Sequence, residues 1–170
     1  FSREHYLAAA GAYLRAIERR LAAGRDARVA CVASLFVSRW DVAVRDEVPA
    51  ALKNRLGIAI AMRTYRAYRE LLASTRWQTL AGAGARPALV APDTINTVPE
   101  KTLLAFAEHG GLSGVLPADG ADAETLLAEF ARAGIDIDAL AARLQEEGVH
   151  AFAESWLALL RRIASKRGVG

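Results

Sequence analysis

The chain has 170 residues, a net charge of +3 and one cysteine, with 53% hydrophobic and 24% charged residues. This length allows one domain with a sizeable core, and one cysteine excludes an internal disulfide. No cluster of Lys and Arg lies beside aromatic residues and no apolar run could span a membrane, so we expect neither nucleic-acid nor membrane partners.

The first predicted element is a helix over residues 1–24. Its apolar residues recur every three or four positions, as on the buried face of an amphipathic helix, and charged residues occupy the other face. Ser2 fits the N-cap position. Gly24 fits the position at which a helix ends in a left-handed residue.

The next element, Val29–Val37, is predicted to be a strand buried on both faces, because it is almost entirely small, β-branched or aromatic. Cys31 would be a buried hydrophobic residue within it. The polarity changes at Arg39, just after the strand, where ligands bind in α/β folds. A guanidinium there suits a phosphate, since its planar fork donates two parallel hydrogen bonds. The alternative is a solvated Arg that pairs with Asp41 or Asp46.

Residues 42–49 are predicted to be a polar loop, followed by a long helix over 50–73 and a short one over 76–81. A short strand is predicted at 89–91. Thr97–Glu100 has the sequence of a capping box, which would start a helix that ends at His109.

The rest of the chain is predicted to be helical. Glycines and cap residues divide it into three helices, with Asp138 as the cap of the second. Their predicted ranges are 123–133, 139–147 and 152–163.

Several of these stretches resemble one family. The Ser, aromatic residue and Arg in Ala33–Arg39 resemble the sixth-strand motif of transaldolases. Ala91–Pro99 resembles the last barrel strand and following helix of that family, and Phe152–Trp156 resembles its C-terminal helices. The resemblance covers nearly the whole chain and implies an α/β fold, a partial (β/α)8 TIM barrel of class I aldolase type with C-terminal helices.

The resemblance also implies a function. Transaldolases transfer a dihydroxyacetone unit between sugar phosphates through a lysine Schiff base, with no metal and no organic cofactor. On this basis Arg39 would bind the substrate phosphate. Ser34 would point into the barrel near the Schiff base, and Phe36 would form a wall of the same site. A cytoplasmic location fits the single cysteine and the absence of a signal peptide.

The chain departs from the family in its lysines. A Schiff-base lysine must lie in a desolvated site that lowers its pKa. The three lysines are Lys53, Lys101 and Lys166, and none of them ends a predicted buried strand. We therefore expect the Schiff-base lysine upstream of Phe1 and no catalytic residue within this chain.

A second departure lies at Pro87 and Ala88, where transaldolases have a further strand and loop. A barrel cannot lose one strand without changing its closure. We therefore expect a segment to be missing between these residues, with a gap larger than the ~3.8 Å that separates Cα atoms across a trans peptide. Residues 1–170 would then be the C-terminal part of one barrel domain that lacks its N-terminal strands.

Two alternatives stay open. The domain could be fused to a glucose-6-phosphate isomerase, as in some bacterial relatives of the family. It could instead be a non-catalytic helical fragment that binds the other half of a barrel. No histidine, cysteine or carboxylate spacing indicates a metal site, and nothing in the sequence sets an oligomeric state.

Overall fold

A computed structural model describes residues 1–85, 97–111, 117 and 122–167, and these form helices and connecting segments with no strand. The chain divides into two compact units. The first unit comprises Phe1–Ser2, Leu35–Ala61 and Asp122–Gly170. The second comprises Arg3–Ser34 and Met62–Ala121. None of the described helices combines the length and apolarity needed to cross a bilayer.

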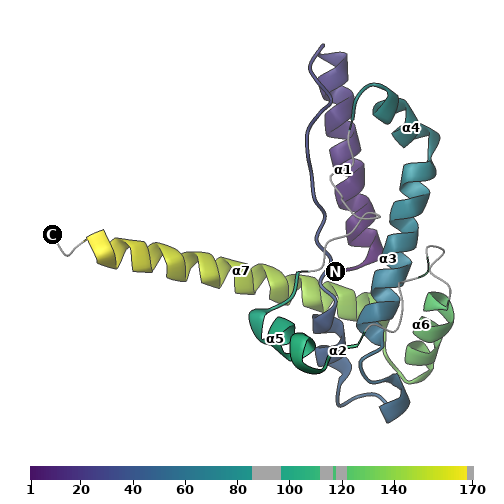
Figure 1. Cartoon of the computed structure of the whole chain (residues 1–170), viewed down its shortest axis with the longest axis vertical. Coiled ribbons are helices and arrows are strands. Elements are labelled where there is room, and N and C mark those ends of the chain that lie inside the picture. The colour runs from purple at the N-terminus through teal and green to yellow at the C-terminus, as the bar shows by residue number, and fades with distance from the viewer. Residues whose placement is uncertain (86–96, 112–116, 118–121, 168–170) are drawn as a thin grey trace. The chain divides into compact units, whose positions relative to one another are not determined.

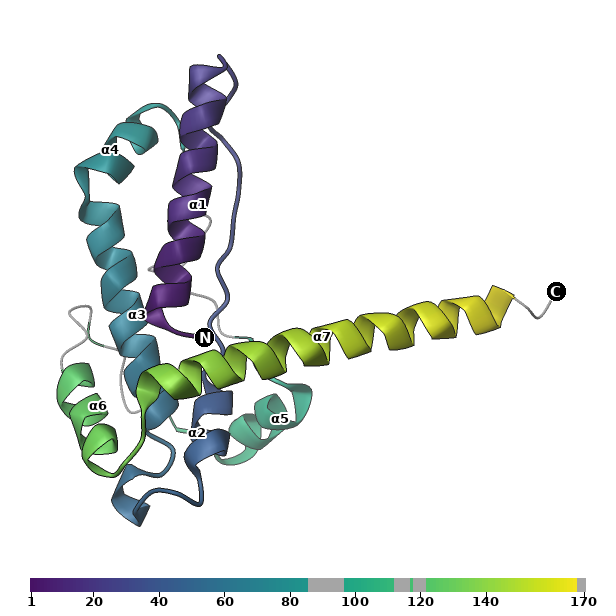
Figure 2. The same ribbon diagram turned by 180° about the vertical axis from the view of Figure 1, so that it is seen from behind.

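In the second unit, α1 (Arg3–Ala22) packs against α4 (Thr75–Gly82), as Figures 1 and 2 show from opposite sides. Leu14 and Ile17 of α1 are buried together with Trp77 and Leu80 of α4, which gives this unit its own core. The predicted helix over 1–24 is therefore confirmed to within two residues at each end. Gly24 has a φ of +66°, the left-handed conformation expected of a residue that ends a helix.

Polar and aromatic contacts also hold the second unit together. Arg76 donates two hydrogen bonds to the Glu18 carboxylate, at 2.6 and 2.9 Å. These bonds hold the pKa of Glu18 below its usual range. The Tyr6 ring meets the Tyr68 ring edge-on at 6.3 Å, and burial, helped by the proximity of Tyr68, raises the pKa of Tyr6 to about 12.

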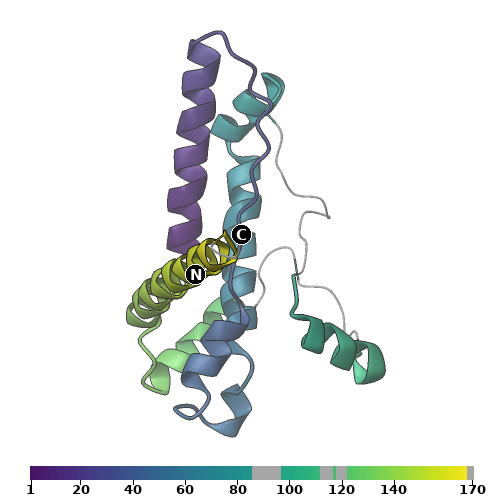
Figure 3. The same cartoon turned by 90° about the vertical axis from the view of Figure 1, so that its left-hand side faces the viewer.

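The same unit contains α5 (Glu100–His109), which has no buried residue and is visible in Figure 3. The capping box predicted at Thr97–Glu100 is wrong. The residue before the helix is Pro99, whose φ of −59° suits a helix entry, and no side chain caps this end.

The first unit is built from α2 (Ser38–Val44), the 3₁₀ turn η1 (Ala50–Leu52), α6 (Ala123–Arg132), α7 (Ile137–Arg167) and the first residues of α3 (Leu56–Ala73). Its core is formed by side chains from all five elements. The largest fully buried ones are Trp40, Val44, Leu56, Ile60 and Phe130.

The predicted strand Val29–Val37 is wrong, since these residues have no regular secondary structure. Cys31 is exposed, and Val32 is 67% exposed. A strand is stable only when its amides and carbonyls pair with a neighbouring strand, and the described residues supply none. The predicted loop at 42–49 is also partly wrong, because its first residues belong to α2.

The long helix predicted over 50–73 begins later, at Leu56. The chain first makes the η1 turn and then passes through Asn54, whose φ is +59°. This left-handed residue breaks the helix. The short helix predicted over 76–81 and the helix predicted over 123–133 are confirmed as α4 and α6.

The two helices predicted over 139–147 and 152–163 are one continuous helix, α7, so Gly148 does not end a helix. A single glycine costs about 1 kcal/mol in a helix interior, and the neighbouring residues favour helix strongly enough to outweigh this. The predicted cap Asp138 is replaced by Asp136, which accepts hydrogen bonds from the amides of Asp138 and Ala139. The predicted strand 89–91 and the predicted break at Pro87 and Ala88 lie outside the described residues.

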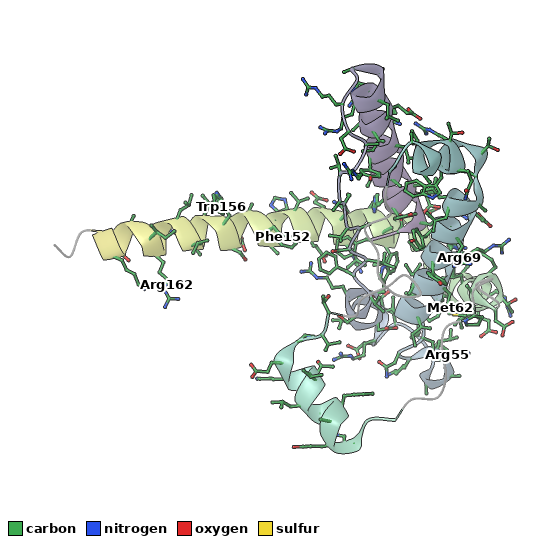
Figure 4. All side chains as sticks on the ribbon, turned by 45° about the horizontal axis from the view of Figure 1, so that its top comes forward. Arg55, Met62, Arg69, Phe152, Trp156 and Arg162 are labelled. Atoms are coloured by element: carbon green, nitrogen blue, oxygen red, sulfur yellow. The ribbon has the colours of Figure 1, made fainter. Side chains whose placement is uncertain are left out.

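The C-terminal half of α7 exposes apolar side chains. Figure 4 shows Phe152, Trp156 and Arg162 projecting from it, and the first two are 63% and 60% exposed. Leu160 and Ile163 follow at helical spacing and are also more than 40% exposed. This part of α7 therefore gains little stability from the core of its own unit.

The start of α3 lies against α2 without room for a side chain at Gly57. A Cβ on Gly57 would collide with the carbonyl oxygen of Val37 and would lie 2.7 Å from Oδ2 of Asp41. Backbone atoms cannot rotate away as a side chain can. The close approach of these two helix ends therefore requires glycine.

We predict that Gly57→Ala lowers the free energy of unfolding by about 1–3 kcal/mol, the usual cost of overpacking a well-packed site. Denaturant titration followed by circular dichroism measures this. Gly11→Ala in α1 is the matched control, because the nearest atom to its new Cβ is 3.4 Å away and alanine favours helix. A Gly57→Ala protein as stable as the control would contradict the close contact.

Candidate anion site at the start of α2

Arg39, predicted to follow a strand, instead lies in the first turn of α2 and is half-buried. Its guanidinium carbon lies 5.1 Å from the centre of the Phe36 ring and 5.8 Å from the centre of the Phe1 ring. Both distances are within the range of a cation–π interaction. Two of the three predicted site residues, Arg39 and Phe36, are therefore together in the structure.

The two rings that hold the guanidinium are themselves fixed. Phe1 and Phe36 stack with their centres 5.0 Å apart and their planes at 26°. Phe36 also contacts Phe152 of α7, at 6.3 Å between ring centres. The indole N–H of the fully buried Trp40 donates a hydrogen bond of 3.2 Å to the carbonyl oxygen of Phe1. This bond ties the Phe1 backbone to α2.

Neither proposed carboxylate partner pairs with Arg39. Oδ1 of Asp41 accepts hydrogen bonds from the amides of Leu56 and Gly57, at 2.9 and 3.2 Å, so it caps the start of α3. Asp46 is exposed. Within the described part of the chain, Arg39 forms no ion pair and its recorded contacts are with aromatic rings.

This arrangement suits an anion. The recorded contacts of the guanidinium with the two rings are cation–π contacts, and its N–H groups have no hydrogen-bond acceptor recorded among the described residues. Those N–H groups can donate parallel hydrogen bonds to two oxygens of a phosphate or carboxylate. Because no protein carboxylate competes within the described residues, the positive charge of Arg39 is open to a ligand.

The other residues considered from the sequence lie elsewhere. Ser34 is exposed and belongs to the second unit. Lys53, Lys101 and Lys166 are all exposed, so none is in the desolvated setting that a Schiff-base lysine needs. Among the described residues no three His, Cys, Asp or Glu side chains are grouped as metal ligands.

Sequence reasoning missed two contributors to this site, Phe1 and Gly148. Gly148 lies in α7 beside the Phe1 ring and the Arg39 guanidinium. The sequence did contain a signal for Gly148, because a glycine between strong helix formers is unfavourable unless another group approaches it closely. Phe1 carried no comparable signal.

Comparison with known proteins identifies the family. Residues 1–163 match the Transaldolase/Fructose-6-phosphate aldolase family. The chain belongs to this family. The transaldolase-like motifs read in the sequence are thus supported by a match over nearly the whole chain.

Individual transaldolases show the same relationship. The chain is 36% identical to the transaldolase of Parafrankia sp. (strain EAN1pec), over 99% of this chain and 54% of the relative. It is 37% identical to the transaldolase of Neisseria meningitidis (strain Z2491), over 94% of this chain and 52% of the relative. It is 38% identical to the transaldolase of Thiobacillus denitrificans, over 89% of this chain and 51% of the relative. The chain therefore spans about half the length of the curated relatives it matches.

We predict that Asp41→Ala lowers the free energy of unfolding by about 0.5–2 kcal/mol, because the first amides of α3 lose their acceptor. Asp41→Asn keeps an acceptor oxygen and should recover most of this loss. Thermal melts of both variants measure the effect, and Asp46→Ala is the matched control at an exposed carboxylate of the same segment. Equal melting temperatures for Asp41→Ala and Asp46→Ala would show that the cap contributes nothing.

Proposed function

We propose that this chain is part of a transaldolase. Such an enzyme transfers a dihydroxyacetone unit between sugar phosphates through a lysine Schiff base, in the pentose phosphate pathway. Family membership and three relatives that carry the name transaldolase support this activity. The comparisons do not favour the alternatives, a non-catalytic helical fragment or a fusion to glucose-6-phosphate isomerase.

The observation that carries the proposal is the geometry of Arg39. The substrates of a transaldolase are phosphate monoesters, and a guanidinium is the side chain best matched to two phosphate oxygens. Arg39 is held over Phe1 and Phe36, without an ion-pair partner in the described residues. A preorganised guanidinium of this kind loses little side-chain entropy when a phosphate binds.

We further propose that residues 1–170 form the C-terminal part of a (β/α)8 barrel. The exposed apolar side chains of Phe152 and Trp156 support this, since a large apolar patch on a soluble protein usually covers another surface. The aligned stretches of 199, 183 and 182 residues are each longer than this chain, so each relative has residues that the chain lacks. A missing segment between Pro87 and Ala88 fits such a difference.

In this proposal the Schiff-base lysine lies upstream of Phe1, and no metal or organic cofactor takes part. Ser34 points into the barrel near the Schiff base, and Phe36 forms a wall of the same site. Phe36 also contacts the guanidinium of Arg39 with its ring. The enzyme would act in the cytoplasm on small sugar phosphates.

We predict that Arg39→Ala in the complete enzyme lowers kcat/KM for fructose 6-phosphate at least about tenfold. Hydrogen bonds to a charged group contribute roughly 1.5–3 kcal/mol, and 1.4 kcal/mol is one factor of ten. For unphosphorylated dihydroxyacetone donors kcat/KM should fall little, since these donors have no phosphate for Arg39 to bind. Steady-state kinetics with both donors measures the difference.

Arg39→Lys is the matched variant for this test. It keeps the charge but loses the planar fork, so it should fall between wild type and Arg39→Ala on the phosphorylated donor. A melting curve controls for the loss of the ring contacts, which for a half-buried guanidinium are worth roughly 0.5–2 kcal/mol. Equal losses on both donors would place the phosphate site elsewhere.

We predict that the 170-residue chain alone gives no borohydride-trapped adduct with fructose 6-phosphate. All three lysines of the chain are exposed, whereas a lysine that attacks a ketone needs a desolvated site. Intact-mass measurement after reduction tests this, with a complete transaldolase as the positive control. A stoichiometric adduct on Lys53, Lys101 or Lys166 would overturn the expectation that the reactive lysine lies upstream.

A further inference from the structure

Gly148 occupies an unfavourable position that the helix alone does not explain. It lies in the interior of α7, where alanine would favour the helix more than glycine does. Among the described residues, the glycines of positive φ are Gly24, Gly84 and Gly134, so Gly148 is not needed for a left-handed turn. Its role must therefore come from the space that it leaves.

That space is filled by the aromatic pair of the anion site. A Cβ on Gly148 would lie 2.9 Å from Cε2 and 3.3 Å from Cζ of Phe1, and 3.7 Å from a terminal nitrogen of Arg39. Carbon atoms in ordinary contact are about 3.5–4.0 Å apart. An alanine at 148 would therefore require the Phe1 ring to move.

Phe1 cannot move without effects on its neighbours. Its ring stacks on Phe36, and the Arg39 guanidinium lies over both rings. Its carbonyl oxygen is held by the Trp40 indole. A displaced ring would tilt or open the stack, and the plane of the guanidinium would turn with it.

We propose that Gly148 is a positioning residue for substrate phosphate: the bare surface of α7 at this residue seats Phe1, and Phe1 with Phe36 sets the plane of the Arg39 guanidinium. This inference rests on the proposed function of Arg39. It adds a specificity element from α7, which is far from Arg39 in the sequence. Two parallel hydrogen bonds need the guanidinium plane in one orientation, so a small rotation weakens phosphate binding more than it weakens the fold.

The test is Gly148→Ala in the complete enzyme, with Gly11→Ala as the matched control in another helix. We expect KM for fructose 6-phosphate to rise between about threefold and tenfold, which corresponds to part of one hydrogen-bonded pair. We expect kcat and the kinetics with unphosphorylated dihydroxyacetone to change less than twofold. The melting temperature should not fall, because alanine favours the helix and offsets the shift of the ring.

Phe1→Leu provides a double-mutant cycle, because leucine lacks the ring atoms that a Cβ at 148 would meet. If Gly148 acts through Phe1, Gly148→Ala should have no further effect on KM in the Phe1→Leu background. An effect of the same size in both backgrounds would overturn the proposal.

The outcomes separate this inference from the function on which it rests. If Arg39→Ala weakens the use of fructose 6-phosphate and Gly148→Ala does not, the positioning role is overturned and the phosphate site stands. If Gly148→Ala impairs the kinetics with both donors equally, the role of Gly148 is structural and the inference also fails. If Arg39→Ala has no effect on the phosphorylated donor, the phosphate site itself is overturned.

Discussion

In the first unit, the Asp41 carboxylate joins α2 to α3, because it accepts hydrogen bonds from two backbone amides at the start of α3. These amides have no partner within their own helix, so the bond joins α2 to α3 at a point where polar groups would otherwise be left unsatisfied. Gly57 allows the two helix ends to meet. Trp40, the residue before Asp41, fills the core below this junction. This contact holds Asp41, two residues after Arg39, against the start of α3.

The two charged residues of α2, Asp41 and Arg39, differ in their contacts. Asp41 is engaged by α3, which leaves the neighbouring Arg39 without a carboxylate partner in the described residues. Aromatic rings then hold the guanidinium through cation–π contacts instead of through an ion pair. An aromatic contact restricts the orientation of a cation without using its N–H donors. Anchored in this way, an Arg can bind an anion without first breaking an ion pair.

The two halves of α7 differ in burial. Leu140, Ala141 and Leu144 are buried in the core of the first unit, whereas Phe152 and Trp156 are mostly exposed. Gly148 lies between these halves and contacts the anion site. A single helix thus supports the core with its first turns and touches the proposed substrate site at its middle. Its last turns present an apolar surface of the kind that usually covers another surface.

The sequence by itself determined the family and most helices, because motifs and apolar periodicity are local properties. It also singled out Arg39 and Phe36, which lie together in the structure. It failed at Val29–Val37, since a strand exists only when a neighbouring strand pairs with it. It also failed to join the two halves of α7, because the reason for Gly148 is a contact with Phe1, distant in the chain. Only the tertiary structure decided that Asp41 caps α3 instead of pairing with Arg39. Whether a carboxylate meets an amide or a guanidinium depends on how the helices pack, which no local pattern encodes.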